Sequence, residues 1–386
     1  MNIKQLDDKF VASTYGRADV TFVEGKGSIL IADDGREYID FGSGIAVNSF
    51  GHNDEEWKSA VTAQINKLAH ASNLYYTEPC AVLAEMLCTR TGAKKVFFSN
   101  SGAEANECAI KCARKYSFDK YGKDRGTIIT LKNSFHGRTL ATITATGQDV
   151  FHDYFYPFPS GFDYATAGDL DELMEKTKSG VCAVIIELIQ GEGGVMPLDE
   201  SFVKGVEKLC KERDILLVVD EVQTGNGRTG ELYAFQGYGI KPDIVSTAKG
   251  LAGGLPLGAT MMFEKVENTL SKGTHGSTFG GNPVSCAGAI SVLSRLNEKL
   301  FEKVKANSEK IVNELKTCKK VASVSGKGFM LGIETSGITA TEAVAKMREK
   351  GLIVLTAKTK IRLLPALNIS DETLEKGLKI MKEILN

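Results

Sequence analysis

Asp220 follows a short apolar run at residues 216–219, and Lys249 follows a second segment with the look of a buried strand at residues 243–248. Such runs, rich in Val, Ile and Leu, predict two buried strands. Ligands of an open parallel sheet bind at the carboxyl edge of its strands, so we expect both side chains to face one crevice. A lysine amine can form an imine with an aldehyde, and a carboxylate can pair with a protonated ring nitrogen. Pyridoxal phosphate (PLP) carries both groups, while a structural ion pair is the alternative that spacing leaves open.

The residues around this pair resemble the signature of the class III (ω-amino acid) aminotransferases. Three runs carry the resemblance: Asp-Glu-Val-Gln-Thr-Gly at 220–225, Gly-Arg-Thr-Gly at 227–230 and Ser-Thr-Ala-Lys-Gly at 246–250. The catalytic lysine of that family matches Lys249, and its pyridine-binding aspartate matches Asp220. Gln223 matches a glutamine that contacts the ring hydroxyl. The resemblance therefore implies a PLP-dependent aminotransferase whose catalytic pair is Lys249 and Asp220.

Small residues between an expected strand at 95–98 and an expected helix from about 101 to 116 suit a phosphate. The first turn of a helix presents free backbone N–H groups. Any tight strand-to-helix turn uses such residues, but by the resemblance Ser101 and Gly102 match the phosphate-binding residues of the family. Thr278, in the run Gly-Ser-Thr-Phe-Gly-Gly-Asn-Pro at 276–283, matches a threonine that reaches the phosphate in the partner subunit. The resemblance thus implies a homodimer with shared active sites, and we assign the neighbouring Ser277 to the substrate side.

Three further residues have types that suit a substrate or a ring. Phe135 offers a flat apolar face, although a core phenylalanine is the alternative. Arg138 lies in a glycine-containing loop at the expected active edge, where a guanidinium aimed at a carboxylate is favoured over a solvated surface charge. Arg362 interrupts an apolar run, and a charge there needs an anionic partner if it is buried.

The resemblance assigns roles to these residues. Phe135 would lie against the pyridine ring, and Arg362 matches the arginine that binds the α-carboxylate of glutamate. Glu192 matches a glutamate that pairs with this arginine and releases it when a carboxylate arrives. Arg138 would then hold the carboxylate of the amino donor. Closure of a glycine turn is the alternative role for Glu192. Leu188 stands where the family usually has proline, a change that leaves Glu192 and its flanking glycines in place.

The runs at 44–48, 135–139 and 362–368 are most similar to the family members that pass the δ-amino group of N-acetylornithine to 2-oxoglutarate, giving glutamate, in arginine biosynthesis. Members that act on ornithine, succinylornithine, succinyl-diaminopimelate or 4-aminobutyrate share these motifs and stay alternatives. An aminomutase of the same fold would turn over without 2-oxoglutarate. A PLP-binding protein without activity is disfavoured because Asp220, Lys249, Arg138 and Arg362 are all present.

Composition is that of an ordinary globular protein, with 42% hydrophobic and 25% charged residues among 386. The net charge of −1 in short mixed blocks favours neither nucleic acid nor an acidic membrane surface as a partner. The first ten residues are polar and no apolar run approaches membrane-spanning length, so we expect a cytoplasmic protein. Cys108 and Cys112 are one helical turn apart without a second pair or nearby histidine, so we expect packed, reduced thiols and no metal site.

Helices and strands alternate from about residue 54, which predicts an α/β fold around a mainly parallel sheet. The resemblance implies the fold-type-I PLP-dependent transferase fold. Its large domain would span 51–284, and a small α/β domain would combine 1–50 with 285–386. Residues 28–41 predict two strands around an Asp-Gly turn, and 147–165 an irregular excursion. Asn282 and Pro283 suit the start of a helix, and we expect one long helix from about 285 to beyond 307. The remaining C-terminal predictions are strands near 329–334, 352–355 and 361–364 and helices at 341–350 and 371–385.

Overall fold

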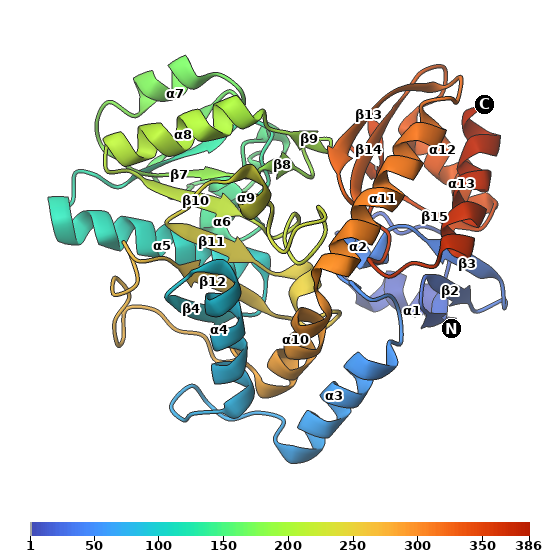
Figure 1. The fold of residues 1–386 in the computed structure, drawn as a ribbon, viewed down its shortest axis with the longest axis horizontal. Coiled ribbons are helices and arrows are strands. Elements are labelled where there is room, and N and C mark those ends of the chain that lie inside the picture. Colours follow the sequence, from blue (N-terminus) through green and yellow to red (C-terminus); the bar gives the residue numbers. More distant parts are fainter. Residues whose placement is uncertain (1) are drawn as a thin grey trace.

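A seven-stranded sheet forms the centre of the computed structural model, which describes residues 2–386 (Figure 1). Its strands, in spatial order, are β4 (Lys95–Ser99), β12 (Gly258–Met262), β11 (Ile244–Thr247), β10 (Leu216–Asp220), β7 (Val181–Ile186), β5 (Thr127–Leu131) and β6 (Phe162–Ala165). Only β12 runs antiparallel to its neighbours; the other pairs are parallel. The prediction of a mainly parallel sheet is therefore confirmed.

Helices lie around this sheet and around the smaller sheets formed by the two ends of the chain (Figure 1). Their bounds are α1 (Ile3–Phe10), α2 (Ser43–Ala46), α3 (Glu55–Lys67), α4 (Glu78–Thr91), α5 (Gly102–Tyr121), α6 (Leu140–Ala145), α7 (Leu170–Lys176), α8 (Glu200–Glu212), α9 (Ala234–Tyr238), α10 (Pro283–Arg295), α11 (Glu298–Leu315), α12 (Ala340–Glu349) and α13 (Asp371–Leu385), with short 3-10 turns η1 (Asp149–Phe151) and η2 (Lys249–Leu251).

Both faces of the central strands are buried, as their continuous apolar sequence requires. Leu217 and Val219 of β10 belong to the same apolar cluster as the inward stripe of α8. Leu216 and Val218, which point the opposite way, cluster with the inner residues of α5. Figure 1 shows α7 and α8 on one side of the strands and α5 on the other. The carboxyl edge of the strands is therefore the edge left open for a site.

Two smaller sheets lie beside the large one. The first contains β1 (Phe22–Lys26), β2 (Ile29–Ala32), β3 (Glu37–Asp40) and β15 (Leu352–Ile353); the second contains β13 (Val321–Lys327), β14 (Met330–Thr335), β17 (Lys360–Leu363) and β16 (Leu355–Ala357); and a short ribbon pairs β8 (Ile189–Gln190) with β9 (Met196–Pro197). Because β15 pairs in parallel with β3, the two ends of the chain share one sheet and lie on the same side of the molecule (Figure 1). The division at residues 50 and 284 stays a prediction.

Three local predictions need correction. The expected long helix is interrupted after α10, because the Asn297 side chain accepts a hydrogen bond from the backbone N–H of Leu300 at 3.1 Å and starts α11 as a separate helix. The strand expected at 352–355 is divided at Val354, and its halves join different sheets. The excursion at 147–165 ends in β6, the edge strand of the large sheet.

Two local predictions, the hairpin at residues 28–41 and the start of a helix at 282–283, are confirmed. Strands β2 and β3 pair around the Asp-Gly turn, where Gly35 has a φ of +82°. The Asn282 side chain accepts hydrogen bonds from the first backbone N–H groups of α10, with Pro283 as the first helical residue. Across residues 2–386, no helix is long and apolar enough to span a membrane. The same residues contain no group of three His, Cys, Asp or Glu side chains that could hold a metal ion.

Candidate active site

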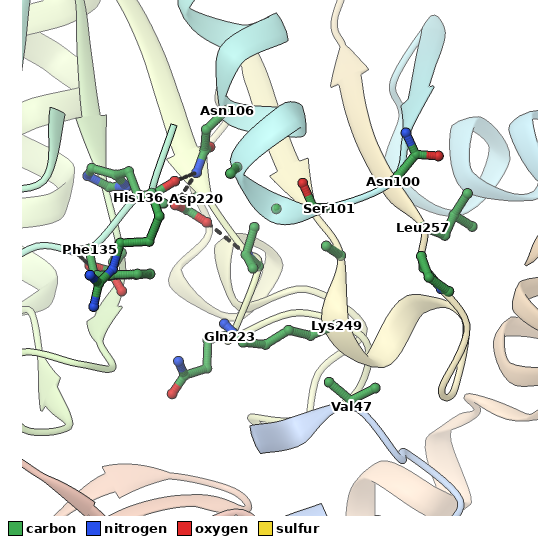
Figure 2. A pocket seen from close by; sticks show the side chains of 18 of the residues that line it. Val47, Asn100, Ser101, Asn106, Phe135, His136, Asp220, Gln223, Lys249 and Leu257 are labelled. Carbon is green, nitrogen blue, oxygen red and sulfur yellow. Dashed lines mark hydrogen bonds and ion pairs between the residues drawn. The ribbon is translucent and has the colours of Figure 1, made fainter. Parts of the chain in front are cut away.

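A cavity of about 450 Å³ opens at the carboxyl edge of the large sheet (Figure 2). Its lining includes seven of the residues expected from the sequence: Ser101, Gly102, Phe135, Arg138, Asp220, Gln223 and Lys249. The cavity forms here because β10 and β11 are adjacent and in parallel register, with Asp220 opposite Ser246. The carboxyl ends of the two strands therefore place Asp220 and Lys249 beside the same cavity.

Asp220 is buried and fully oriented by hydrogen bonds. Its Oδ2 accepts from Asn106 Nδ2 at 2.7 Å and is 2.8 Å from His136 Nδ1, and its Oδ1 accepts from the backbone N–H of Val222 at 3.0 Å. Burial lowers the pKa of His136, but the hydrogen bond and charge of Asp220 outweigh it, so the pKa is raised overall. Figure 2 shows the three side chains together. The arrangement holds a carboxylate in a fixed position where water is excluded.

Lys249 has a free amine. Across the described residues 2–386, its Nζ makes no hydrogen bond and no ion pair, and Figure 2 shows the side chain extending toward Gln223. Burial lowers the pKa of Lys249, partly opposed by the charges of Asp220 and Glu192. A lowered pKa increases the neutral fraction of the amine, which is the nucleophilic form. The residue begins η2 with a φ of +43°, a backbone conformation that non-glycine residues rarely adopt.

The N-terminus of α5 provides unpaired backbone donors on the other wall. Ser101 caps this helix, and its Oγ accepts from the backbone N–H of Glu104 at 3.2 Å. Within residues 2–386, the backbone N–H groups of Gly102 and Ala103 have no partner. A Cβ at position 102 would lie 2.6 Å from Cγ1 of Val222, so the close packing here requires glycine. Two free amides at the start of a 20-residue helix suit a phosphate.

Arg362 and Glu192 are outside the cavity lining, and Arg362 contacts the lining residue Gln223. Nη1 of Arg362 is 2.5 Å from Oε1 of Glu192 and donates to Oε1 of Gln223 at 3.3 Å. The Arg362 side chain is only 4% exposed, whereas Glu192 is 32% exposed. The carboxylate of Glu192 is therefore the anionic partner that the buried charge of Arg362 needs. Glu192 is the more solvent-accessible residue of the pair.

Phe135 and Arg138 lie at the wall formed after β5. The backbone N–H of Phe135 donates to Oε1 of Glu187 at 2.8 Å, and the ring is half-buried. Arg138 is exposed and lies over the ring of Phe151, with Cζ 4.0 Å from its centroid. Both residues are thus available to a ligand in the cavity.

Ser277 and Thr278 are outside the lining of this cavity. Ser277 Oγ accepts from the backbone N–H of Gly280 at 2.9 Å and from Nδ2 of Asn100, a lining residue, at 3.3 Å. Thr278 is exposed. Its assignment to the site of a partner subunit stays a prediction.

Sequence reasoning missed Asn106 and Glu187 and gave His136 no role. Glu187 follows β7 directly, and β7 lies beside β10 with Ile186 opposite Val219. The rule that selected Asp220 would therefore also have selected Glu187. Its two carboxylate oxygens accept from the backbone N–H groups of Phe135 and Gly191, at 2.8 and 3.2 Å. Burial raises the pKa of Glu187 to about 7, although His136 lowers it.

Comparison with known proteins identifies the family. Residues 10–385 match the family described as aminotransferase class-III. The acetylornithine aminotransferase of Haemophilus ducreyi is 50% identical over 386 residues, which cover 100% of this chain and 98% of that protein. The succinylornithine transaminase of Yersinia pseudotuberculosis serotype O:1b is 42% identical, covering 97% and 94%. A structure of ornithine aminotransferase from Toxoplasma gondii, described with partial occupancy of PLP at its active site, superposes with a TM-score of 0.94 at 30% identity, covering 99% and 93%.

The chain therefore belongs to the class-III aminotransferases, a family of PLP-dependent transaminases. Its fold is the fold-type-I arrangement of PLP-dependent transferases. The family and fold expected from the sequence motifs are both confirmed.

Proposed function

We propose that this chain moves the δ-amino group of N-acetylornithine to 2-oxoglutarate, giving N-acetylglutamate 5-semialdehyde and glutamate, with pyridoxal 5′-phosphate bound in the cavity. The observation that carries this proposal is the free Lys249 amine sharing one cavity with the buried carboxylate of Asp220. The donor is chosen because the relative from H. ducreyi is named for it.

The cavity residues fit the cofactor group by group. The free amides of Gly102 and Ala103 suit the phosphate, and the half-buried ring of Phe135 suits one face of the pyridine. Asp220 would pair with the ring nitrogen, and Gln223 would contact the ring hydroxyl. The amine of Lys249 would hold the cofactor covalently. When bound, PLP supplies an aldehyde that takes up the amino group and a ring that withdraws electrons from the substrate carbon.

The residues of this chain would then handle charge and protons. The Lys249 amine would take the proton from the carbon that bears the substrate amine, for which a lowered pKa is suitable. Asp220, held by His136 and Asn106, would keep a negative charge toward the ring nitrogen and so favour its protonated form. Burial of this network excludes water, which strengthens the electrostatic interaction.

Two substrates must use the same cavity. N-acetylornithine reacts at its δ-amine and has a distant carboxylate, whereas glutamate reacts at its α-amine beside a carboxylate. We assign the distant carboxylate to Arg138 and the near carboxylate to Arg362. Glu192 covers Arg362 at 2.5 Å until a near carboxylate displaces it. Ser277 completes the substrate side.

We also propose that the enzyme is a homodimer in which Thr278 completes the phosphate site of the partner. A patch of exposed apolar side chains supports this assembly: Leu74 (86% exposed), Tyr75 (72%), Tyr76 (106%) and Phe279 (59%). The patch comes from two segments of the chain, residues 74–76 and the segment of Phe279. Nδ2 of Asn73 connects them by donating to the carbonyls of Ser277 and Gly280 at 2.9 and 2.8 Å. An apolar patch of this kind, next to Thr278, is typical of a protein interface.

A donor panel tests the function. N-acetylornithine, ornithine, succinylornithine, succinyl-diaminopimelate and 4-aminobutyrate are each assayed with 2-oxoglutarate, and Lys249→Ala serves as the inactive control. We expect the highest kcat/KM for N-acetylornithine, by about tenfold or more, since acyl-pocket discrimination commonly reaches that size. A higher value for another donor would replace the substrate assignment. Turnover without 2-oxoglutarate would indicate an aminomutase, and borohydride labelling of a lysine other than Lys249 would refute the catalytic assignment.

A further inference from the structure

The guanidinium of Arg138 makes no hydrogen bond within residues 2–386. Its side chain is exposed at the cavity. An unrestrained arginine side chain populates many rotamers. A ligand that binds it loses affinity, because the side chain must then be held in one rotamer. A carboxylate site built on such a residue therefore benefits from a contact that restricts the arginine in advance.

The ring of Phe151 makes such a contact. Cζ of Arg138 is 4.0 Å from the centroid of Phe151 and 5.7 Å from that of Phe135. The two rings themselves meet edge to face, with centroids 5.7 Å apart and an interplanar angle of 73°. A cation over an aromatic ring is attracted by the negative face of the ring. This attraction uses none of the N–H donors, so all of them stay available for a carboxylate.

The segment that carries Phe151 is fixed to the same loop as Arg138. On one side of η1, Gln148 Nε2 donates to the carbonyl of Ser134 at 3.0 Å. On the other side, the ring Nε2 of His152 is 2.9 Å from the carbonyl of Ile143 in α6, the helix that follows Arg138. The position of the Phe151 ring is thus set by the backbone that also sets the base of the Arg138 side chain.

We propose that Phe151 is a positioning residue for Arg138, holding its guanidinium at the cavity so that donors with a carboxylate far from the reacting amine bind tightly. The inference rests on the proposed function, because it takes Arg138 as the group that binds the carboxylate of the donor. Phe151 acts through Arg138 and does not touch the reacting atoms.

The test compares two donors that differ only in this carboxylate. N-acetylputrescine is N-acetylornithine without the carboxylate, and the donor half-reaction of each is followed in single turnovers of the holoenzyme. Phe151→Leu keeps apolar bulk but removes the aromatic face. We expect the half-saturation concentration for N-acetylornithine to rise about three- to tenfold, with its limiting rate and all constants for N-acetylputrescine unchanged. The dissociation constant of N-acetylnorvaline, which lacks the δ-amine, should rise by the same factor.

Three controls make the result specific. Phe118→Leu makes the same replacement at an exposed position of α5 and should change neither donor. Phe151→Tyr keeps the aromatic face and should restore wild-type constants. Phe151→Met repeats the test with another flexible apolar side chain.

Equal losses for both donors, or unchanged N-acetylornithine binding in both Phe151→Leu and Phe151→Met, would overturn the positioning role. If the unmodified enzyme does not prefer N-acetylornithine over N-acetylputrescine, Arg138 does not bind the carboxylate of the donor. That result would refute the role of Arg138 in the proposed function and, with it, the positioning role of Phe151.

Discussion

Replacement of Glu192 by glutamine should make the enzyme less selective against α-amines. Glu192 pairs with the buried Arg362 at 2.5 Å, and Nη1 of Arg362 also donates to Gln223 at 3.3 Å; within residues 2–386 it has no other acceptor. In the proposed switch, a glutamate substrate displaces Glu192 from Nη1 so that its α-carboxylate can pair with the guanidinium. Glu192→Gln keeps the size and a neutral acceptor but removes the charge, so Arg362 becomes easier to release.

The magnitude follows from the burial of the pair. In Glu192→Gln the charged guanidinium keeps a hydrogen bond to a neutral acceptor, so the term that is lost is the ion-pair attraction. Solvent-exposed ion pairs contribute about 0.2–1 kcal/mol, and because Glu192 is 32% exposed while Arg362 is 4% exposed, we take the upper end of this range. A loss of about 1 kcal/mol is about a fivefold change in an equilibrium. We therefore expect kcat/KM for glutamate to rise about fivefold relative to N-acetylornithine.

The assay is the donor half-reaction, recorded as the change in cofactor absorbance when each amino donor is mixed with the PLP form. Glu231→Gln is a matched control, because Glu231 pairs with Lys305 at 2.6 Å and is 35% exposed, away from the cavity. Its effect on the ratio of the two donors should be negligible. An unchanged ratio in Glu192→Gln, or an equal loss of both donors in Arg362→Ala, would refute the switch.

Two further outcomes follow from the buried network. Asp220→Ala should leave the fold intact but lower turnover by several orders of magnitude, because the ring nitrogen loses its anion; near-normal turnover would mean that another carboxylate has this role. For Glu187, the pKa is about 7 in the folded protein against an ordinary 4.5, so the folded state binds the proton more tightly and stability falls as pH rises from 4.5 to 7. The melting temperature of cofactor-free Glu187→Gln, minus that of the unmodified chain, should therefore grow across this range and stay constant above pH 7; a pH-independent difference would contradict the argument.

The sequence predicted the parts of the site that local pattern determines. Asp220 and Lys249 follow apolar strands, and adjacent parallel strands bring their ends together by geometry alone. Asn106 could not be predicted in this way, because its meeting with Asp220 depends on the rotation of α5 about its axis. The pairing of Glu192 with Arg362 joins residues 170 positions apart and was expected only from the family resemblance.

The predictions of secondary structure were wrong where strands are too short to show a hydrophobic periodicity. Strands β15 and β16 contain two and three residues, and the single residue Val354 separates two sheets. At Asn297, helix periodicity continues on both sides, and only the capping hydrogen bond marks the break. At Val354 tertiary packing decides the path of the chain, so a window of sequence does not contain the answer. At Asn297 the break is local, and a residue type that favours helix N-caps was the available signal.

The two arginines of the site are restrained by different chemistry, and this difference explains the proposed selectivity. Arg362 is paired through its Nη1 with a carboxylate 2.5 Å away, so a competing carboxylate close to the cofactor has to displace Glu192 to take that donor. Cζ of Arg138 lies 4.0 Å from an aromatic centroid, and this contact leaves its N–H donors unpaired within residues 2–386. Under the proposed assignment, the distant carboxylate of the donor would bind an arginine that is already free to receive it, whereas a near carboxylate would first have to displace Glu192. The cavity would then favour the δ-amine of an acylated donor over α-amines without excluding glutamate by size.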